Sequence, residues 1–171
     1  MQAAQQFGLK GLSFRTLAAQ VGVKSSSVHY YFPEKGDLAF ALIERYAVGF
    51  EQALLELTSS PISLKEKLEG FIDLFASTAE SGKLCLCGMM AAELDQLDEK
   101  SRALLSQYFE HAERWLETLL SGHKSEIRST LPPALLASNL MAGLEGALLL
   151  DRVSGGSKRL DAQRAVAVSW L

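Results

Sequence analysis

Apolar residues recur at close to four-residue spacing through most of this 171-residue chain, and this repeat restricts the fold to helices. The clearest repeat covers residues 37–57, and another begins near residue 98 and ends near residue 122. The period-two alternation that marks half-buried strands is absent, and short runs of Gly, Pro and Ser separate the helical segments. We therefore expect an all-α fold.

Helix boundaries follow from local signals. Ser13 is a typical N-cap, Gly22 permits a sharp turn, and Ser63 with Glu66 has the spacing of a capping box. Helices are expected at 1–8 (with Ala4 and Phe7 facing inward), 13–20, 24–32, 37–58, 63–81, 84–94, 98–122, 133–153 and 158–171, with a short helical turn within 123–130. Pro33 is expected at the start of the helix that continues from Asp37. The chain then divides into an N-terminal domain at 1–36 and a helical domain at 37–171.

Composition places the chain among globular proteins, with 48% apolar residues. No apolar run approaches the roughly 20 residues of a membrane span, because Glu145 interrupts the nearest candidate, LMAGLEGALLL. The N-terminus lacks the basic start and apolar stretch of a secretory signal. Two cysteines spaced C-x-C suit a reducing compartment. We expect a cytoplasmic protein that does not contact a membrane.

Two short helices around a tight turn occupy the segment from Ser13 to Lys35. A small apolar seam is expected between them, formed by Leu17, Ala18, Val21, Val23 and Val28. The second helix is almost bare of core residues and offers Lys24, Ser25, Ser26, Ser27, His29, Tyr30 and Tyr31. Residues 1–38 carry four basic and two acidic side chains, whereas the remainder has a net charge of -5. A polar helix on an apolar brace at the positive end of the chain favours DNA as the partner.

Each polar side chain of this segment suits one kind of DNA contact. Ser13 and Arg15 lie near a helix N-terminus, where backbone N–H groups favour phosphate. The tyrosine and serine hydroxyls and Lys35 suit phosphate oxygens, and Lys24 with the early residues of the second helix suits base edges. The alternatives are that Tyr30 and Tyr31 close a small core with Phe32, that the serines are ordinary polar surface, and that Lys35 is a solvated charge.

The segments SFRTLAAQVGV, SSSVHYYF and PEKGDL resemble the tetracycline-repressor (TetR) family of bacterial transcriptional regulators. The resemblance covers about residues 3–50. It implies an all-helical homodimer that binds a palindromic operator and a ligand-binding core that controls DNA affinity. It matches Ser13 and Arg15 to the supporting helix, Lys24, Ser25, Ser26 and Ser27 to the recognition helix, and Tyr31 and Lys35 to backbone contacts. His29 stands where the family commonly has tyrosine, and an imidazole can still hydrogen-bond a phosphate.

The resemblance also implies that the chain begins partway through the family's first helix. No basic arm precedes this helix. We therefore expect an N-terminally truncated regulator whose DNA affinity is lower than that of the natural protein.

A regulator of this kind needs a mostly apolar pocket among the helices at 63–80, 84–95, 98–120 and 133–153. Candidate lining residues are Phe71, Phe75, Met89, Met90, Glu93, Tyr108, His111, Trp115, Met141 and Glu145. For each of them, ordinary core packing is the alternative. The effector expected from these walls is a small apolar molecule, in keeping with a repressor that the molecule releases from DNA.

The helices at 133–153 and 158–171 form a candidate dimer interface. Gly155 and Gly156 separate them, which favours an antiparallel pair. Small residues at Ala137, Ala142, Gly143, Gly146 and Ala147 allow close approach, and several leucines surround them. A four-helix bundle with a second copy would cover these apolar faces. Packing within one chain is the alternative.

A second class of function rests on Cys85 and Cys87. Two residues two apart on a helix point in different directions, and their apolar setting raises thiol pKa, which favours buried structural cysteines. A helical ligand-binding or thiol redox-sensing protein with weak or lost DNA binding stays open as the alternative function.

Enzymatic chemistry finds no support in the sequence. The three histidines, His29, His111 and His123, are scattered, and no metal-ligand spacing, phosphate loop or nucleophile elbow is present. We expect no enzyme, no cofactor and no metal.

Overall fold

The computed structural model describes all 171 residues, and the chain folds entirely into helices without a strand. The order is α1 (Gln2–Phe7), α2 (Phe14–Val21), α3 (Ser25–Tyr31), α4 (Lys35–Ser59), α5 (Leu64–Glu80), α6 (Leu86–Ala92), η1 (Leu94–Gln96), α7 (Glu99–Gly122), η2 (Lys124–Glu126), α8 (Pro133–Ser154) and α9 (Lys158–Val168). The all-α prediction is confirmed, with an N-terminal helix–turn–helix domain and a C-terminal helical domain.

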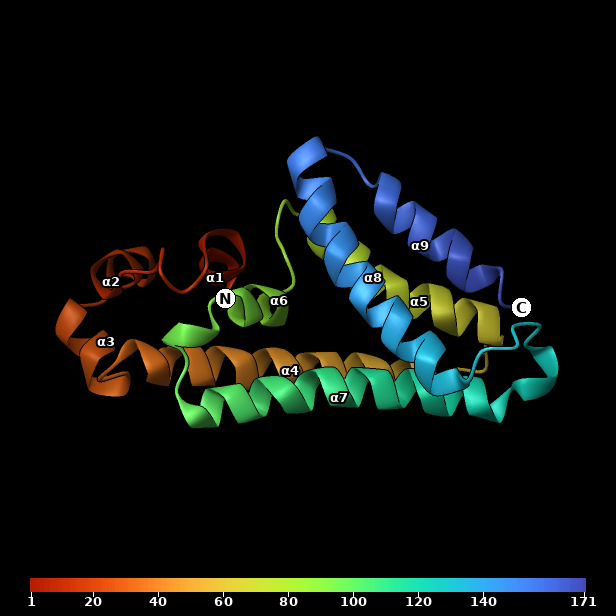
Figure 1. Cartoon of the computed structure of the whole chain (residues 1–171). Coiled ribbons are helices and arrows are strands. Elements are labelled where there is room, and N and C mark those ends of the chain that lie inside the picture. Colours follow the sequence, from red (N-terminus) through yellow and green to blue (C-terminus); the bar gives the residue numbers. More distant parts are fainter.

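Helices α4 and α7 lie side by side along the length of the molecule, and α8 crosses them together with α5 and α9 (Figure 1). Helices α1 to α3 form one end. Leu38 and Ala39, at the start of α4, belong to the same buried cluster as Ala4 and Leu9. The N-terminal helices are therefore continuous with the main core through the first turns of α4.

Several boundaries differ from the sequence prediction in instructive ways. Helix α4 begins at Lys35, because Glu34 and Asp37 form a capping box, and Pro33 precedes this cap instead of opening the helix. Helix α6 begins at Leu86, so the two residues before it lie outside the helix. The expectation that Phe7 faces inward is wrong, because α1 has six residues and buries only Ala4 and Gln5, leaving Phe7 60% exposed.

Helix α8 is long and apolar enough to cross a membrane by length and composition alone, contrary to the sequence argument from Glu145. In the fold it packs against α5, α7 and α9, and eight of its residues are buried. These contacts are those of a core helix in a helical bundle.

Candidate DNA interface and core cavity

Local capping and one glycine set the geometry of α2 and α3. The Ser13 hydroxyl accepts a hydrogen bond from the Thr16 backbone N–H at 3.4 Å and opens α2. Gly22 ends α2 in the left-handed region, at φ 72° and ψ 28°, which costs a residue without Cβ little. The turn allows α3 to pack beside α2, with the small Ala18 buried at the brace.

The apolar seam between these helices is smaller than the sequence suggested. Leu17 and Val28 are half-buried, but Val21 and Val23 are exposed. The prediction that these two valines fill the seam is wrong. Val21 lies in the last turn of α2 and Val23 follows the turn at Gly22, and both side chains are exposed there.

Helix α3 presents its side chains to solvent. None of its seven residues is buried, and the Tyr30 and Tyr31 rings are 81% and 73% exposed. The two rings contact each other edge to face with centroids 5.3 Å apart, so neither closes a core with Phe32. His29 instead turns its ring toward Phe14 of α2, at a centroid distance of 4.7 Å.

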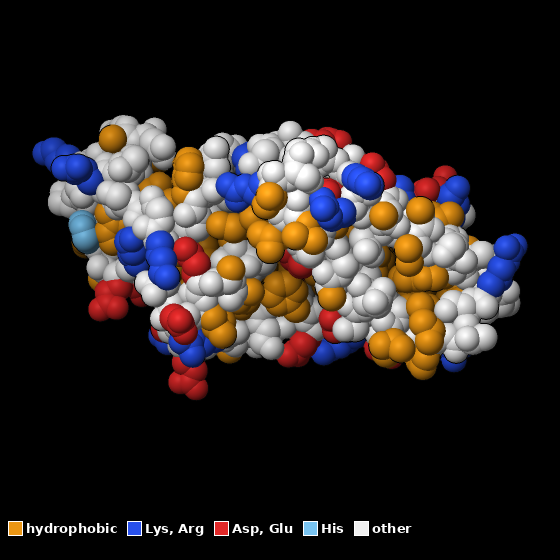
Figure 2. All heavy atoms as spheres, turned by 45° about the horizontal axis from the view of Figure 1, so that its top comes forward, with side chains coloured by type: hydrophobic (Ala, Val, Ile, Leu, Met, Phe, Trp, Pro, Cys, Tyr) orange, Lys and Arg blue, Asp and Glu red, His pale blue; other side chains and the backbone are white.

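The remaining candidate DNA contacts surround α3. Ser13, Arg15, Lys24, Ser26, Ser27 and Lys35 are exposed, and Ser25 is half-buried. Lys35 also donates from Nζ to the Leu9 carbonyl at 3.5 Å, which holds the first turn of α4 against the segment after α1. Lys and Arg side chains lie at the end of the molecule formed by α2 and α3 (Figure 2). The structure thus brings all the predicted DNA-contacting side chains to one end.

Comparison with known proteins bears on this end of the chain directly. The family described as "Bacterial regulatory proteins, tetR family" matches residues 1–42, which cover α1 to α3 and the start of α4. The N-terminal part of the chain thus matches the TetR family. Members are DNA-binding transcriptional regulators and not enzymes.

TetR-family proteins of known structure share the whole fold. A TetR transcriptional regulator from Legionella pneumophila is 28% identical, with a TM-score of 0.88 over 97% of this chain and 89% of that chain. A TetR-family regulator from Agrobacterium tumefaciens is 23% identical, with a TM-score of 0.90 over 98% of this chain and 90% of that one. Among relatives compared by sequence alone, the HTH-type transcriptional repressor DhaR of Mycobacterium sp. (strain GP1) is 23% identical over 90% of this chain and 79% of its own length.

A cavity of about 300 Å³ lies among α6, α7 and α8. Its lining is mainly apolar, including Met89, Phe109 and Leu148, and its polar groups are the Glu145 carboxyl and the Cys85 thiol. Of the predicted ligand contacts, it contains Met89 and Glu145. Gly88 faces the carboxylate of Glu145, and a Cβ at this position would clash with Oε2.

The other predicted pocket residues are distributed differently. Tyr108 and His111 line a cleft of about 220 Å³ between α4 and α7, and His111 and Trp115 line another of about 370 Å³ toward the far end of α7. Four of the predicted pocket residues are buried in the core and line none of these three cavities: Phe71, Phe75, Met90 and Met141. Phe71 stacks on Trp115 at 5.5 Å, an arrangement that fills space between α5 and α7.

Glu93 has a structural partner instead of a place in the cavity. Its carboxylate accepts hydrogen bonds from the backbone N–H groups of Leu9 and Lys10. Nearby, Gln5 donates from Nε2 to the Leu84 carbonyl at 3.3 Å. The two ends of α6 are therefore attached to α1 and the loop that follows it. Sequence reasoning missed these links because about 80 residues separate the partners.

The two thiols lie in a polar cluster, which corrects the expectation of two inert cysteines pointing apart. Cys85 precedes α6, so helical spacing does not apply to it. The Tyr46 hydroxyl donates to Cys85 Sγ at 3.7 Å, and the Tyr108 hydroxyl lies 3.8 Å from the same sulfur. The Cys87 thiol also lowers the pKa of Cys85.

Within this cluster the pKa of Cys85 is lowered, whereas the pKa values of Glu145 and Cys87 are raised. Burial alone would raise the pKa of Cys85, but hydrogen bonds to its sulfur outweigh burial and lower the pKa to about 6. The groups responsible are Cys87, Glu145, the Gly88 N–H and Tyr46. Burial, and then the neighbouring Cys85, raises the pKa of Glu145 to about 10. Burial likewise raises the pKa of Cys87, as the sequence led us to expect for both thiols.

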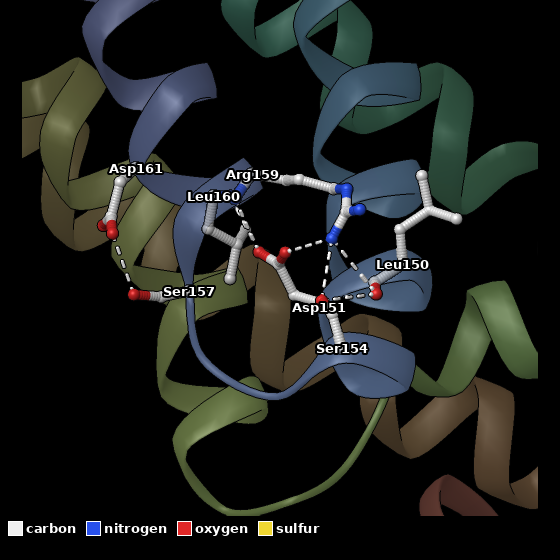
Figure 3. Close-up of polar contacts among 7 residues, drawn as sticks. All are labelled: Leu150, Asp151, Ser154, Ser157, Arg159, Leu160 and Asp161. Carbon is white, nitrogen blue, oxygen red and sulfur yellow. Dashed lines mark hydrogen bonds and ion pairs between the residues drawn. The ribbon is translucent and has the colours of Figure 1, made fainter.

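The turn between α8 and α9 is fixed by a buried acid that the sequence did not reveal. Asp151 accepts hydrogen bonds from the backbone N–H groups of Arg159 and Leu160 at 2.9 and 3.1 Å, and from the Arg159 guanidinium at 3.0 Å (Figure 3). The Ser157 hydroxyl, at the usual N-cap position, binds Asp161 instead. Asp151 therefore caps α9 from α8 and sets the angle of this helix pair.

Proposed function

We propose that this TetR-family regulator is a repressor that binds a palindromic operator as a homodimer in the cytoplasm, and that a small apolar molecule releases it. The exposure of α3 carries the DNA-binding part, because a helix with no buried residue leaves its side chains available for a partner. DhaR is named a repressor, which supports repression and not activation as the function of this chain.

In this proposal residues 1–36 form the DNA-binding domain. Ser13 and Arg15 bind phosphate at the start of α2, and Lys24 with Ser25, Ser26 and Ser27 reaches base edges in the major groove. The groups that hold the DNA backbone are His29, Tyr30, Tyr31 and Lys35. Hydroxyl and ammonium donors at exposed positions suit phosphate oxygens.

Residues 37–171 form the ligand-binding and dimerisation domain in this proposal. Helices α8 and α9 leave exposed apolar side chains at Leu135, Leu149, Leu150, Val153 and Val166. Apolar side chains emerge over this part of the surface in Figure 2. A second copy would cover them in a four-helix bundle. The cavity among α6, α7 and α8 is the proposed effector site, because it is mainly apolar with few polar groups.

Operator binding is tested with the full chain and DNA from upstream of its own gene, or with operators selected from a random pool. Fluorescence anisotropy should show salt-sensitive binding, with log affinity falling linearly against log salt. Tyr31→Ala and Lys35→Ala should weaken binding to all sequences, and loss of Lys35 should reduce the salt slope by about 1. Lys24→Ala and Ser26→Ala should change sequence preference instead.

Lys124→Ala, which removes an exposed lysine of η2 after the far end of α7, provides the matched control and should leave affinity unchanged. Binding no tighter to selected operators than to random DNA would contradict the proposal. That result would favour a ligand-binding protein without an operator.

A further inference from the structure

The core cavity holds a nucleophile, the Cys85 thiol, and one carboxyl, that of Glu145, in an otherwise apolar lining. Cys85 lines this cavity, whereas Cys87 does not. The volume of about 300 Å³ equals about ten liquid water molecules, enough for a molecule of several non-hydrogen atoms. The apolar walls favour an uncharged molecule over a charged one.

We propose that Cys85 is a covalent modification site for small, uncharged α,β-unsaturated carbonyl compounds that enter this cavity. Two observations identify the class. The sulfur accepts a hydrogen bond from the Tyr46 hydroxyl, which stabilises its ionised form, and thiolates add readily to conjugated carbonyls. Glu145 lies beside the sulfur with a buried Oε1 that has no hydrogen-bond partner, so the cavity also offers an acid to the carbonyl compound.

The addition needs no oxidant. Cys85 loses its proton to solvent, and at neutral pH a pKa of about 6 leaves it as thiolate. The sulfur forms a bond to the β-carbon while the carbon–carbon π bond breaks and its electron pair moves toward the carbonyl oxygen. Glu145, which stays protonated below its pKa of about 10, delivers a proton to the resulting enolate and regains one from water. The product is a thioether with the carbonyl intact.

Titratable groups from three other helices face this sulfur. Tyr46 belongs to α4, Tyr108 to α7 and Glu145 to α8, and Cys87 completes the set from α6 itself. The reaction therefore occurs where α4, α6, α7 and α8 meet. Given the proposed function, a bound adduct would displace α6, whose ends are attached to α1 and the following loop through Leu84 and Glu93. We expect it to lower operator affinity about tenfold, within the usual range of allosteric coupling.

The test exposes the folded, full-length chain to methyl vinyl ketone and locates adducts by intact mass and peptide mapping. We expect one adduct per chain, on Cys85. Cys85→Ser should remove it, and Cys87→Ser, which keeps a hydroxyl donor, should retain it. The rate should be half-maximal near pH 6, and Tyr46→Phe should raise this midpoint by about one unit because one stabilising hydrogen bond is lost.

A maleimide carried on a long polyethylene glycol chain tests entry, because it cannot fit the cavity and should label Cys85 only after unfolding in urea. Labelling of Cys87 at an equal rate, or no adduct in the folded chain, would overturn the proposal. An adduct that leaves operator affinity unchanged would overturn its regulatory part. DNA binding by the unmodified chain reports separately on the proposed function.

Discussion

Two adjacent alanines of α2 differ in what surrounds them. Ala18 is buried where α2 packs on α3, whereas Ala19 is exposed to solvent. Packing therefore restricts the size of the side chain at position 18, whereas a larger side chain can be accommodated at position 19.

Replacing Ala18 by Leu should destabilise the protein by about 1–3 kcal/mol, because extra methylene groups would force α2 and α3 apart. Urea denaturation of the full chain measures the change. Ala19→Leu is the control, since its larger side chain would extend into solvent. Equal stability of the two variants would show that the brace has room for a larger residue.

Asp151 is a second residue whose importance depends on its surroundings. Burial would raise its pKa, but hydrogen bonds from the Leu160 N–H and from the N–H and guanidinium of Arg159 outweigh burial, so its pKa is lowered. Its carboxylate thus stabilises the fold above the pKa of an unfolded aspartate, near 3.8, and this contribution is lost as pH falls through the lower folded value.

Asp151→Asn should therefore cost about 2 kcal/mol at neutral pH, because an amide N–H group would face backbone donors. The difference from wild type should shrink in acid, below about pH 4. Thermal unfolding at a series of pH values measures both effects. Asp161→Asn is the matched control on the exposed side of α9, and it should change stability much less. A difference independent of pH would mean that the carboxylate charge is not what stabilises the turn.

At the scale of elements, α6 is short but lies between the cavity and the N-terminal helices. One side of it lines the cavity through Gly88 and Met89, and the residue after it, Glu93, holds the backbone of Leu9 and Lys10. Movement of this helix would therefore reach the DNA-binding end.

Glu93→Ala should release the loop after α1 without unfolding the core. We expect amide hydrogen exchange at Leu9 and Lys10 to become at least about tenfold faster, because a charge-assisted hydrogen bond is lost. Hydrogen-exchange mass spectrometry of the peptide covering these residues measures it. Asp95→Ala removes a nearby exposed carboxylate and should leave the exchange unchanged. Equal protection in both variants would contradict the proposed link.

At the scale of the whole molecule, α8 and α9 combine a well-packed inner side with an exposed apolar outer side. Leu135 and Val153 of α8 are 52% and 85% exposed, although neighbouring residues of the same helix are buried. A surface of this kind in a compact chain favours association.

Leu135→Arg should dissociate the proposed dimer and leave the monomer folded. Sedimentation velocity measures the oligomeric state, and circular dichroism measures helix content. The control is Leu55→Arg, which changes a residue of similar exposure, 56%, on α4 and outside the α8–α9 surface. A wild-type chain that sediments as a monomer, or equal effects of both substitutions, would contradict an interface at α8 and α9.

Helix order, most helix boundaries and the helix–turn–helix were predictable from the sequence. The signals behind them act over a few residues: the cap at Ser13, the glycine at position 22, and the capping box of Ser63 and Glu66 are all confirmed. The exposure of α3 was also predictable, because its sequence has too few apolar residues to bury. By contrast, Val21, Val23 and Phe7 were misplaced, since apolar character alone does not tell which side of a short helix faces a neighbour.

The sequence by itself therefore determined the helical class of this protein and the polar helix at its DNA-binding end. Only the tertiary structure decided which residues line the cavity, that Cys85 and Cys87 have opposite pKa shifts, and that Glu93 and Asp151 hold distant helices. The physical reason is the sequence separation over which each kind of interaction acts. Helix periodicity and capping connect residues about four positions apart, whereas Cys85 meets Tyr46 across 39 positions and Glu93 meets Leu9 across 84. Contacts at such separations depend on how complete helices pack.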